Sequence, residues 1–192
     1  MATERRLITS IENEYRRYKA LGESAIGQLS DDQLSARAGD VDNSIAVIVW
    51  HVSGNLTSRF TDFLTSDGEK PWRHREEEFS RRTVTRDELL AKWNDGWRAL
   101  LDALQGLADD DLFRTVAIRG ESLAVHEALH RSLAHTAHHV GQIVYLAKAL
   151  RGSGWSYLSI PPGRSEQYNA APALDRPADQ AKALDHARKA GA

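Results

Sequence analysis

Apolar residues recur every three or four positions in four segments of the chain, which is the spacing of one face of an α-helix. The pattern predicts helices over residues 4–29, 44–64, 86–107 and 124–150. The connections between them are short or irregular, so each helix must bury its apolar face against the others. Four such helices predict an all-α fold, and specifically an antiparallel four-helix bundle.

Signals for helix ends support these limits. Ser30 with Gln33, and Thr85 with Glu88, have the spacing of a capping box, in which two side chains satisfy backbone N–H groups at the start of a helix. The first pair predicts a short turn of helix, and the second pair predicts the start of the third long helix. Gly152 follows the last segment and is expected to end it.

Two connections carry signals of their own. The charged segment 65–82 contains Gly68 and Pro71, which interrupt regular structure, so no core element is expected there. Residues 111–123 hold β-branched residues followed by Gly120, which predicts an extended excursion between helices.

The composition changes near residue 170. We expect residues 1–169 to form the bundle and residues 170–192 to form a mobile C-terminal tail, because the tail has two prolines and no strong apolar stripe. Its histidine is therefore excluded from any metal site. The alternative is a helix that docks on a neighbouring subunit through a thin stripe: Ala181, Leu184 and Ala187.

Composition and charge exclude several classes of protein. The chain has 192 residues, of which 41% are hydrophobic and 27% charged, as in an ordinary globular protein. The formal net charge of −2 gives no basic surface for nucleic acid, and no apolar run approaches the roughly 20 residues of a membrane span. The absence of cysteine excludes disulfides and thiolate ligands. With a charged N-terminus that lacks a signal-peptide pattern, we expect a cytoplasmic protein.

The last helix carries two pairs of histidines four residues apart, which places the rings of each pair on one face. The pairs are His126 with His130 and His135 with His139, and they point in nearly opposite directions. His130 shares its direction with Lys148, which indicates solvent. We therefore expect His135 and His139 to face the interior.

A third histidine, His51, lies inside an apolar run of the second long helix. A lone histidine in such a run is most often a core residue with ordinary hydrogen bonds. If His51 faces His135 and His139 across the bundle, three neutral imidazoles suit Zn²⁺, Ni²⁺ or Fe²⁺. Such a site leaves open positions for water or a substrate.

Four neighbours of these histidines invite an interpretation. Gln142 lies one turn beyond His139, where it would hydrogen-bond a ligand ring or a bound water, or simply lie at the margin. Asn55 lies one turn beyond the histidine of the second helix and could orient a ligand. His138 points away from the shared direction and is given a supporting or surface role. Gly141 suggests close packing against a neighbouring helix.

Residues 4–169 resemble the DinB-like superfamily of four-helix proteins. The resemblance is carried by "SIAVIVWHVSGNLTSRFTDFLTSDGEKPWRHR", "LAHTAHHVGQIVYLAKALRG" and "SIPPGRSEQYN". It implies a metal triad with one histidine on the second helix and two on the last, which correspond to His51, His135 and His139. The superfamily includes S-transferases that use bacillithiol or mycothiol and a mycothiol-dependent maleylpyruvate isomerase, and many members have no established activity.

Two classes of function remain open. In the first, a metal-dependent enzyme lowers the pKa of a low-molecular-weight thiol that attacks an electrophile, or of a water molecule that hydrolyses a small substrate. Arg164, in a Pro-Gly loop, would then meet a substrate carboxylate or be a plain loop residue. The alternative is a non-catalytic, stress-linked binding or dimerisation module with a structural or vestigial metal. An open metal position beneath an accessible pocket would favour the enzyme. A homodimer is expected.

Overall fold

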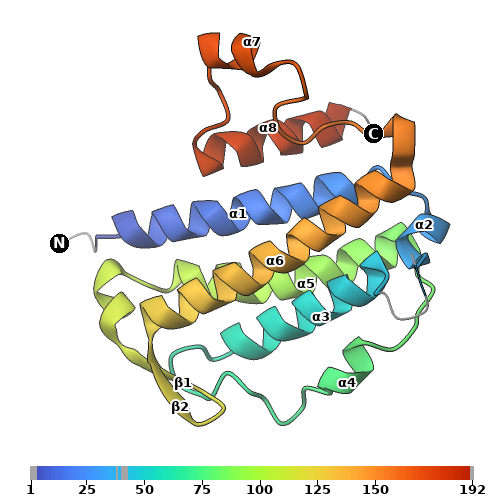
Figure 1. Ribbon diagram of the computed structural model, residues 1–192. Coiled ribbons are helices and arrows are strands. Elements are labelled where there is room, and N and C mark those ends of the chain that lie inside the picture. Colours follow the sequence, from blue (N-terminus) through green and yellow to red (C-terminus); the bar gives the residue numbers. More distant parts are fainter. Residues whose placement is uncertain (1–3, 38, 40–42, 191–192) are drawn as a thin grey trace.

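The computed structural model describes residues 4–37, 39 and 43–190, and it confirms an all-α protein with one small β-hairpin (Figure 1). In the part of the chain that the structure describes, no helix combines the length and apolar character of a membrane span. The elements are α1 (Arg6–Ile26), α2 (Asp31–Ser35), α3 (Ile45–Phe60), α4 (Arg75–Glu78), α5 (Arg86–Gln105), β1 (Thr115–Ile118), β2 (Glu121–Ala124), α6 (Val125–Arg151), α7 (Ser165–Ala170) and α8 (Pro177–Ala190), with 3₁₀ turns at Asp109–Phe113 and Gly152–Gly154.

The main hydrophobic core lies between the four long helices α1, α3, α5 and α6. Trp93 and Trp97 of α5 are fully buried, and their ring centroids lie 5.2 Å apart. Tyr15 of α1 is also fully buried, and its hydroxyl donates a hydrogen bond of 2.9 Å to the carbonyl oxygen of Leu129 on α6. The two tryptophans therefore fill the core from α5, and Tyr15 links α1 directly to α6.

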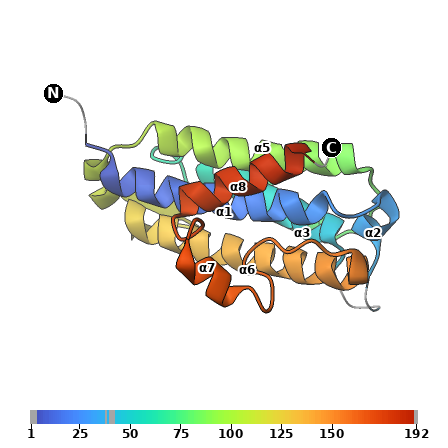
Figure 2. The ribbon, with the colours of Figure 1, turned by 90° about the horizontal axis from the view of Figure 1, so that it is seen from above.

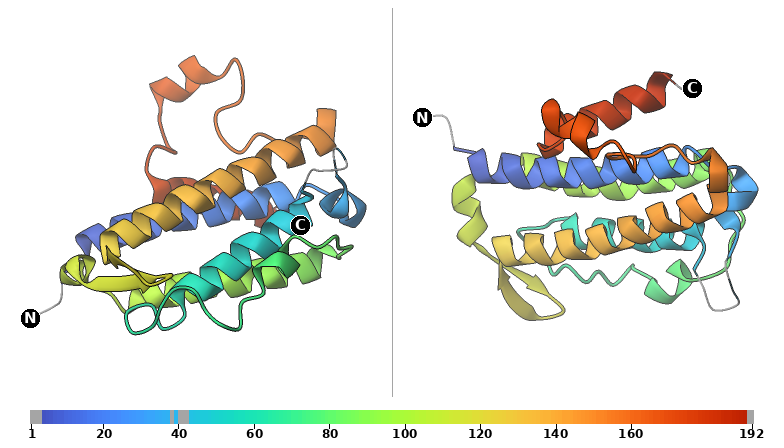
Figure 3. Two further views of the ribbon diagram at one scale, coloured as in Figure 1. Left: turned by 60° about the horizontal axis from the view of Figure 1, so that its bottom comes forward. Right: turned by 45° about the horizontal axis from the view of Figure 1, so that its top comes forward.

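The direction of the helices differs from the simple antiparallel order that we expected. α1 and α6 run one way, and α3 and α5 both run the other way (Figures 1 and 3). The segment 61–85 must therefore return along the length of the molecule before α5 begins, and we call it the crossover. α3 and α5 approach closely because Gly96 has no side chain: a Cβ there would meet the backbone of Ser53.

The predicted helix starts are confirmed. The backbone N–H of Ser30 donates to Gln33 Oε1 at 3.0 Å, and that of Thr85 donates to Glu88 Oε2 at 2.8 Å, so both capping boxes form. The last long helix ends at Gly152, which has a φ of 60°. Local sequence therefore determines where these helices begin and end.

The crossover also corrects an expectation. We predicted no core element in this charged segment, yet Lys70 and Glu78 are each only 7% exposed. Their burial is tolerated because each has partners: the Lys70 ammonium, for example, donates to the carbonyl oxygen of Asp67 at 2.5 Å. A charged segment can therefore be part of the interior when its own polar groups satisfy one another.

The extended excursion predicted at 111–123 contains the hairpin, in which Arg119 and Gly120 form a two-residue turn with φ of 58° and 79°. The Asp67 carboxylate of the crossover accepts hydrogen bonds from the backbone N–H groups of Glu69, Gly120 and Arg119, at 2.6, 2.7 and 2.8 Å. These bonds lower the pKa of Asp67 to about 2. The crossover therefore holds the hairpin in place.

The C-terminal segment, expected to be a mobile tail, contains α8, which lies along α1 of the same chain (Figure 2). Ala181 and Leu184 pack with Ala20 in a small separate cluster. Arg188 adds an ion pair with Glu23 at 3.2 Å. Two residues of the thin apolar stripe, Ala181 and Leu184, thus lie against the chain's own first helix, whereas Ala187 is exposed. The domain boundary at residue 169 stays a prediction.

We expect Leu184→Ala to lower the free energy of unfolding by about 1–2 kcal/mol, because the apolar contact that holds α8 is small and α8 can detach without opening the main core. Lys182→Ala, on the exposed side of the same helix, is the matched control and should have no effect. Denaturant unfolding measures both variants. A Leu184→Ala protein as stable as the parent would contradict this expectation and support a mobile tail.

Candidate metal centre

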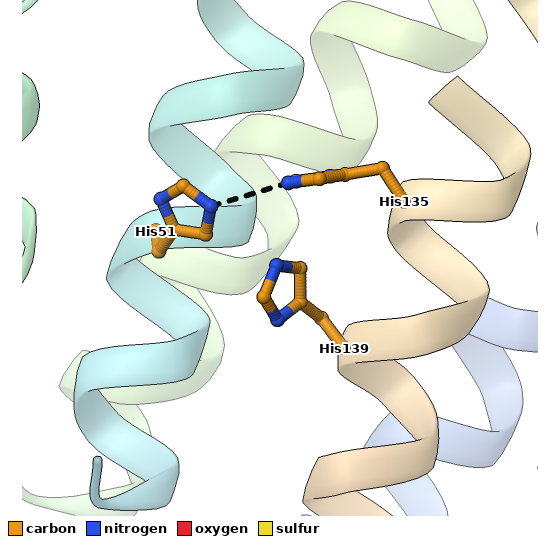
Figure 4. A group of neighbouring side chains, drawn as sticks. All are labelled: His51, His135 and His139. Carbon is orange, nitrogen blue, oxygen red and sulfur yellow. Dashed lines mark hydrogen bonds between the residues drawn. The ribbon is translucent and has the colours of Figure 1, made fainter. Parts of the chain in front are cut away.

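Three histidines from two helices converge between α3 and α6, with His51 on α3 and His135 and His139 on α6 (Figure 4). Their candidate ligand atoms all lie within 4.8 Å of one another. The Nε2 atoms of His51 and His135 are 3.2 Å apart. Two imidazoles bound to one tetrahedral Zn²⁺ at about 2.0–2.1 Å have nitrogens roughly 3.3–3.4 Å apart. The group could therefore hold a metal ion after small side-chain adjustments.

Hydrogen bonds set the protonation of two of the rings. Nδ1 of His51 donates to Glu78 Oε2 at 2.9 Å, and Nδ1 of His139 donates to Gln142 Oε1 at 2.8 Å. Because a neutral imidazole carries one proton, Nε2 of each ring keeps its lone pair. Oxygen acceptors on the second ring nitrogen are the usual support of metal-binding histidines. This donor set fits a divalent metal.

The third ring differs. Nδ1 of His135 is buried and has no hydrogen-bond partner among residues 4–37, 39 and 43–190. Its Nε2 faces that of His51, whose proton lies on the far side of the ring. The position of His135 therefore depends on packing and on the other two histidines.

Glu78 is the supporting residue that the sequence did not reveal. Its carboxylate accepts two hydrogen bonds from Arg73, whose side chain is 3% exposed, at 2.8 and 2.9 Å. Burial alone would raise the pKa of Glu78, but the bonds from His51 and Arg73 outweigh it and hold the pKa below its usual range. Gly54 makes room, because a methyl group there would overlap the carboxylate.

Burial keeps the imidazole rings of His135 and His139 neutral. It lowers the pKa of His135 to about 3, with contributions from the neighbouring rings of His139 and His51. Burial also lowers the pKa of His139, although the hydrogen bond with Gln142 acts in the opposite direction. Both rings are therefore neutral at pH 7, which is the form of imidazole that binds metals.

The other histidines lie apart from this cluster, as the helical-face argument predicted. His130 is exposed, and Nδ1 of the half-buried His126 donates to the carbonyl oxygen of Leu112 at 2.9 Å. His138 is exposed, with its ring centroid 5.1 Å from that of His139. It therefore borders the cluster from outside.

Two further residues considered in the sequence, Arg164 and Gly141, are exposed. Arg164 is exposed at the start of α7, where it donates to Gln167 Oε1 at 3.1 Å, and Figure 1 places α7 on the opposite side of α1 from α3. The structure thus does not bring Arg164 to the histidines. Gly141 is exposed, and a Cβ there would meet nothing within 4 Å among the described residues. Nothing in the structure explains a glycine at that position.

A pocket of about 150 Å³ reaches the cluster at His135. It lies between α3 and α6, includes Asn55 in its lining, and extends to Ile118 of β1. The hydrogen bonds that Asp67 accepts from the hairpin turn hold Ile118, and with it this side of the pocket, in position. A small molecule could therefore approach the histidines from the side of the hairpin.

A family model described as "Protein of unknown function (DUF1572)" covers residues 2–164. No curated protein matches the chain. The matched range includes both helices that carry the three histidines and ends just before α7.

We expect about one divalent ion per chain, and we expect it to be lost or greatly weakened in His135→Ala and His139→Ala, since each removes one of three ligands. His130→Ala, on the exposed face of the same helix, is the control and should retain the metal. Elemental analysis of protein made without a histidine-rich tag measures the content. Equal losses in His130→Ala and His139→Ala would contradict the assignment.

Glu78→Gln should weaken metal affinity by about 10–100-fold, as is typical when the partner of a ligand histidine is changed. The substitution keeps the shape of the side chain but removes the charge that orients His51 and binds Arg73. Glu77→Gln, at the exposed neighbouring position, is the matched control. Competition with a chromogenic chelator gives both affinities, and an unchanged affinity in Glu78→Gln would show that the carboxylate is not a support.

The metal-free protein should lose stability as the pH falls below about 6.5. In the folded chain the pKa of His135 is about 3, against an ordinary value of 6.5. Between these values only the unfolded chain binds the proton, so acid favours unfolding. Urea unfolding at pH 7.5 and pH 5 should show a smaller loss for His135→Gln than for the parent or for His130→Gln. Identical losses in all three proteins would refute this.

Proposed function

The chain belongs to the DUF1572 family of proteins of unknown function, and we propose that it is a divalent-metal-dependent enzyme acting on a small molecule. One observation carries this proposal: three imidazole nitrogens converge, and one of the three histidines, His135, lines a pocket. A purely structural site would be closed on all sides. The resemblance to the DinB-like superfamily, with its four-helix bundle and histidine triad, supports the same assignment.

In this proposal His51, His135 and His139 hold the metal, which is Zn²⁺, Ni²⁺ or Fe²⁺. When bound, the metal lowers the pKa of a coordinated thiol or water molecule. The chain has no cysteine, so a thiol has to come from solution as a low-molecular-weight cosubstrate. Attack of the thiolate on an electrophile gives S-transfer, and attack of hydroxide gives hydrolysis.

The protein's own groups orient the ligands. Glu78 accepts the Nδ1 proton of His51, and Arg73 keeps that carboxylate ionised and fixed. Gln142 accepts the Nδ1 proton of His139. The supporting residues thus keep two lone pairs directed at one point, which lowers the reorganisation needed when the metal binds.

The test measures metal content and turnover on the same samples. Tag-free protein is analysed for metals and then mixed with bacillithiol, mycothiol or glutathione and a chromogenic electrophile, and separately with a small ester. We expect rates that scale with metal content, fall to background in His135→Ala and persist in His130→Ala. Background rates at full metal loading would contradict an enzyme and favour the non-catalytic binding module with a structural metal.

We also propose a homodimer, because several large apolar side chains remain on the surface of a single chain. They are Leu7, Trp72, Phe113, Tyr145, Tyr157 and Ile160. Sedimentation velocity at micromolar concentration is expected to show a dimer. Monomer across that whole range would remove the proposal.

A further inference from the structure

The pocket beside the histidines changes in chemistry along its length. Asn55 lies about one helical turn after His51 on α3, and Arg131 lies about one turn before His135 on α6. Because the two helices run in opposite directions, both residues lie on the side of the histidines that faces the hairpin. Apolar side chains line the pocket farther from the histidines: Phe60, Phe63, Ile118 and Ala128. The pocket thus has a polar end next to the candidate metal centre and an end under the hairpin that is apolar apart from Arg59.

Two polar groups at the near end have no protein partner. Within the described ranges, neither Asn55 nor Arg131 makes a hydrogen bond or an ion pair. Arg59, which also lines the pocket, is instead engaged with Glu69 at 3.2 Å, and Arg119 contacts the same carboxylate at 2.9 Å. Glu69 is therefore already paired, and the guanidinium of Arg131, an exposed residue of α6, remains available to an anion.

The size of the pocket limits what can enter. Its volume is about 150 Å³. An engineered apolar cavity of about this volume in another protein holds benzene. The rings of Phe60 and Phe63, with centroids 5.0 Å apart, form an aromatic wall at the apolar end. An apolar body of about six carbon atoms therefore fits, with its charged group toward Arg131.

We propose that this pocket binds a small monocarboxylate with an apolar body of about six carbon atoms. The carboxylate accepts charge-assisted hydrogen bonds from the Arg131 guanidinium and a further bond from the Asn55 amide. The body contacts Phe60, Phe63 and Ile118. The pocket would be the substrate subsite of the enzyme proposed above, so this inference rests on that proposed function. The carboxylate then lies about one turn from His135, between the apolar body and the histidine nitrogens.

Calorimetric titration with benzoate and with its neutral analogue benzamide tests the proposal on the full chain, both metal-loaded and chelator-stripped. We expect benzoate to bind at least about tenfold more tightly than benzamide in both forms. Arg131→Gln should remove this preference and leave the affinity for benzamide unchanged. Arg98→Gln, which changes an arginine 66% exposed on α5 and paired with Asp95, is the matched control and should bind like the parent.

Equal benzoate affinities of the parent and Arg131→Gln would overturn the proposal. Binding of benzoate to the metal-loaded form alone, with no loss in Arg131→Gln, would also overturn it, because the metal would then hold the carboxylate. Elemental analysis of the same samples tests the proposed function separately. If the chain takes up no metal but binds benzoate through Arg131, the carboxylate pocket is supported and the proposed metal-dependent enzyme is contradicted. If the metal-loaded chain binds no benzoate, only the carboxylate pocket is contradicted.

Discussion

The candidate centre depends on the buried carboxylate of Glu78. An ionised carboxylate is stable away from water only when charge and hydrogen bonds compensate for its lost hydration. Arg73 provides the charge and two hydrogen bonds, and His51 provides a third. These contacts determine which nitrogen of His51 carries the proton, and thereby which nitrogen faces the α6 histidines. One carboxylate thus sets the chemistry of a group that lies 27 residues away in the sequence.

Helical periodicity is enough to select the α6 pair of the site, because it fixes which residues share a face. It separates His135 and His139 from His126 and His130, and the structure brings the former pair to His51. It cannot reveal Glu78, because the crossover has no period and three adjacent glutamates look alike in sequence. The role of Gly54, which leaves room for the carboxylate, also cannot be deduced from the sequence, because it depends on where α3 and Glu78 lie relative to each other.

In the fold too, neighbouring residues determine some features, and contacts between distant residues determine others. Caps and apolar periodicity predict where the long helices lie. The periodicity does not settle which of two adjacent apolar residues faces the core: Ile8 is fully buried, whereas Leu7 is 55% exposed. The parallel course of α3 and α5 is not encoded in either helix. It requires the crossover to return along the molecule, and the close contact between Gly96 and Ser53 forms only once both helices are in place.

The crossover has a consequence for how this family can vary. Connections between helices ordinarily accept insertions, since added loop length changes the closure entropy little. Here Asp67 holds the hairpin that walls the pocket, and Arg73 and Glu78 hold His51. An inserted residue between positions 67 and 78 would shift one anchor relative to the other. This connection should therefore keep its length across relatives as strictly as a core helix does, and length changes should occur instead in the connection between α6 and α8.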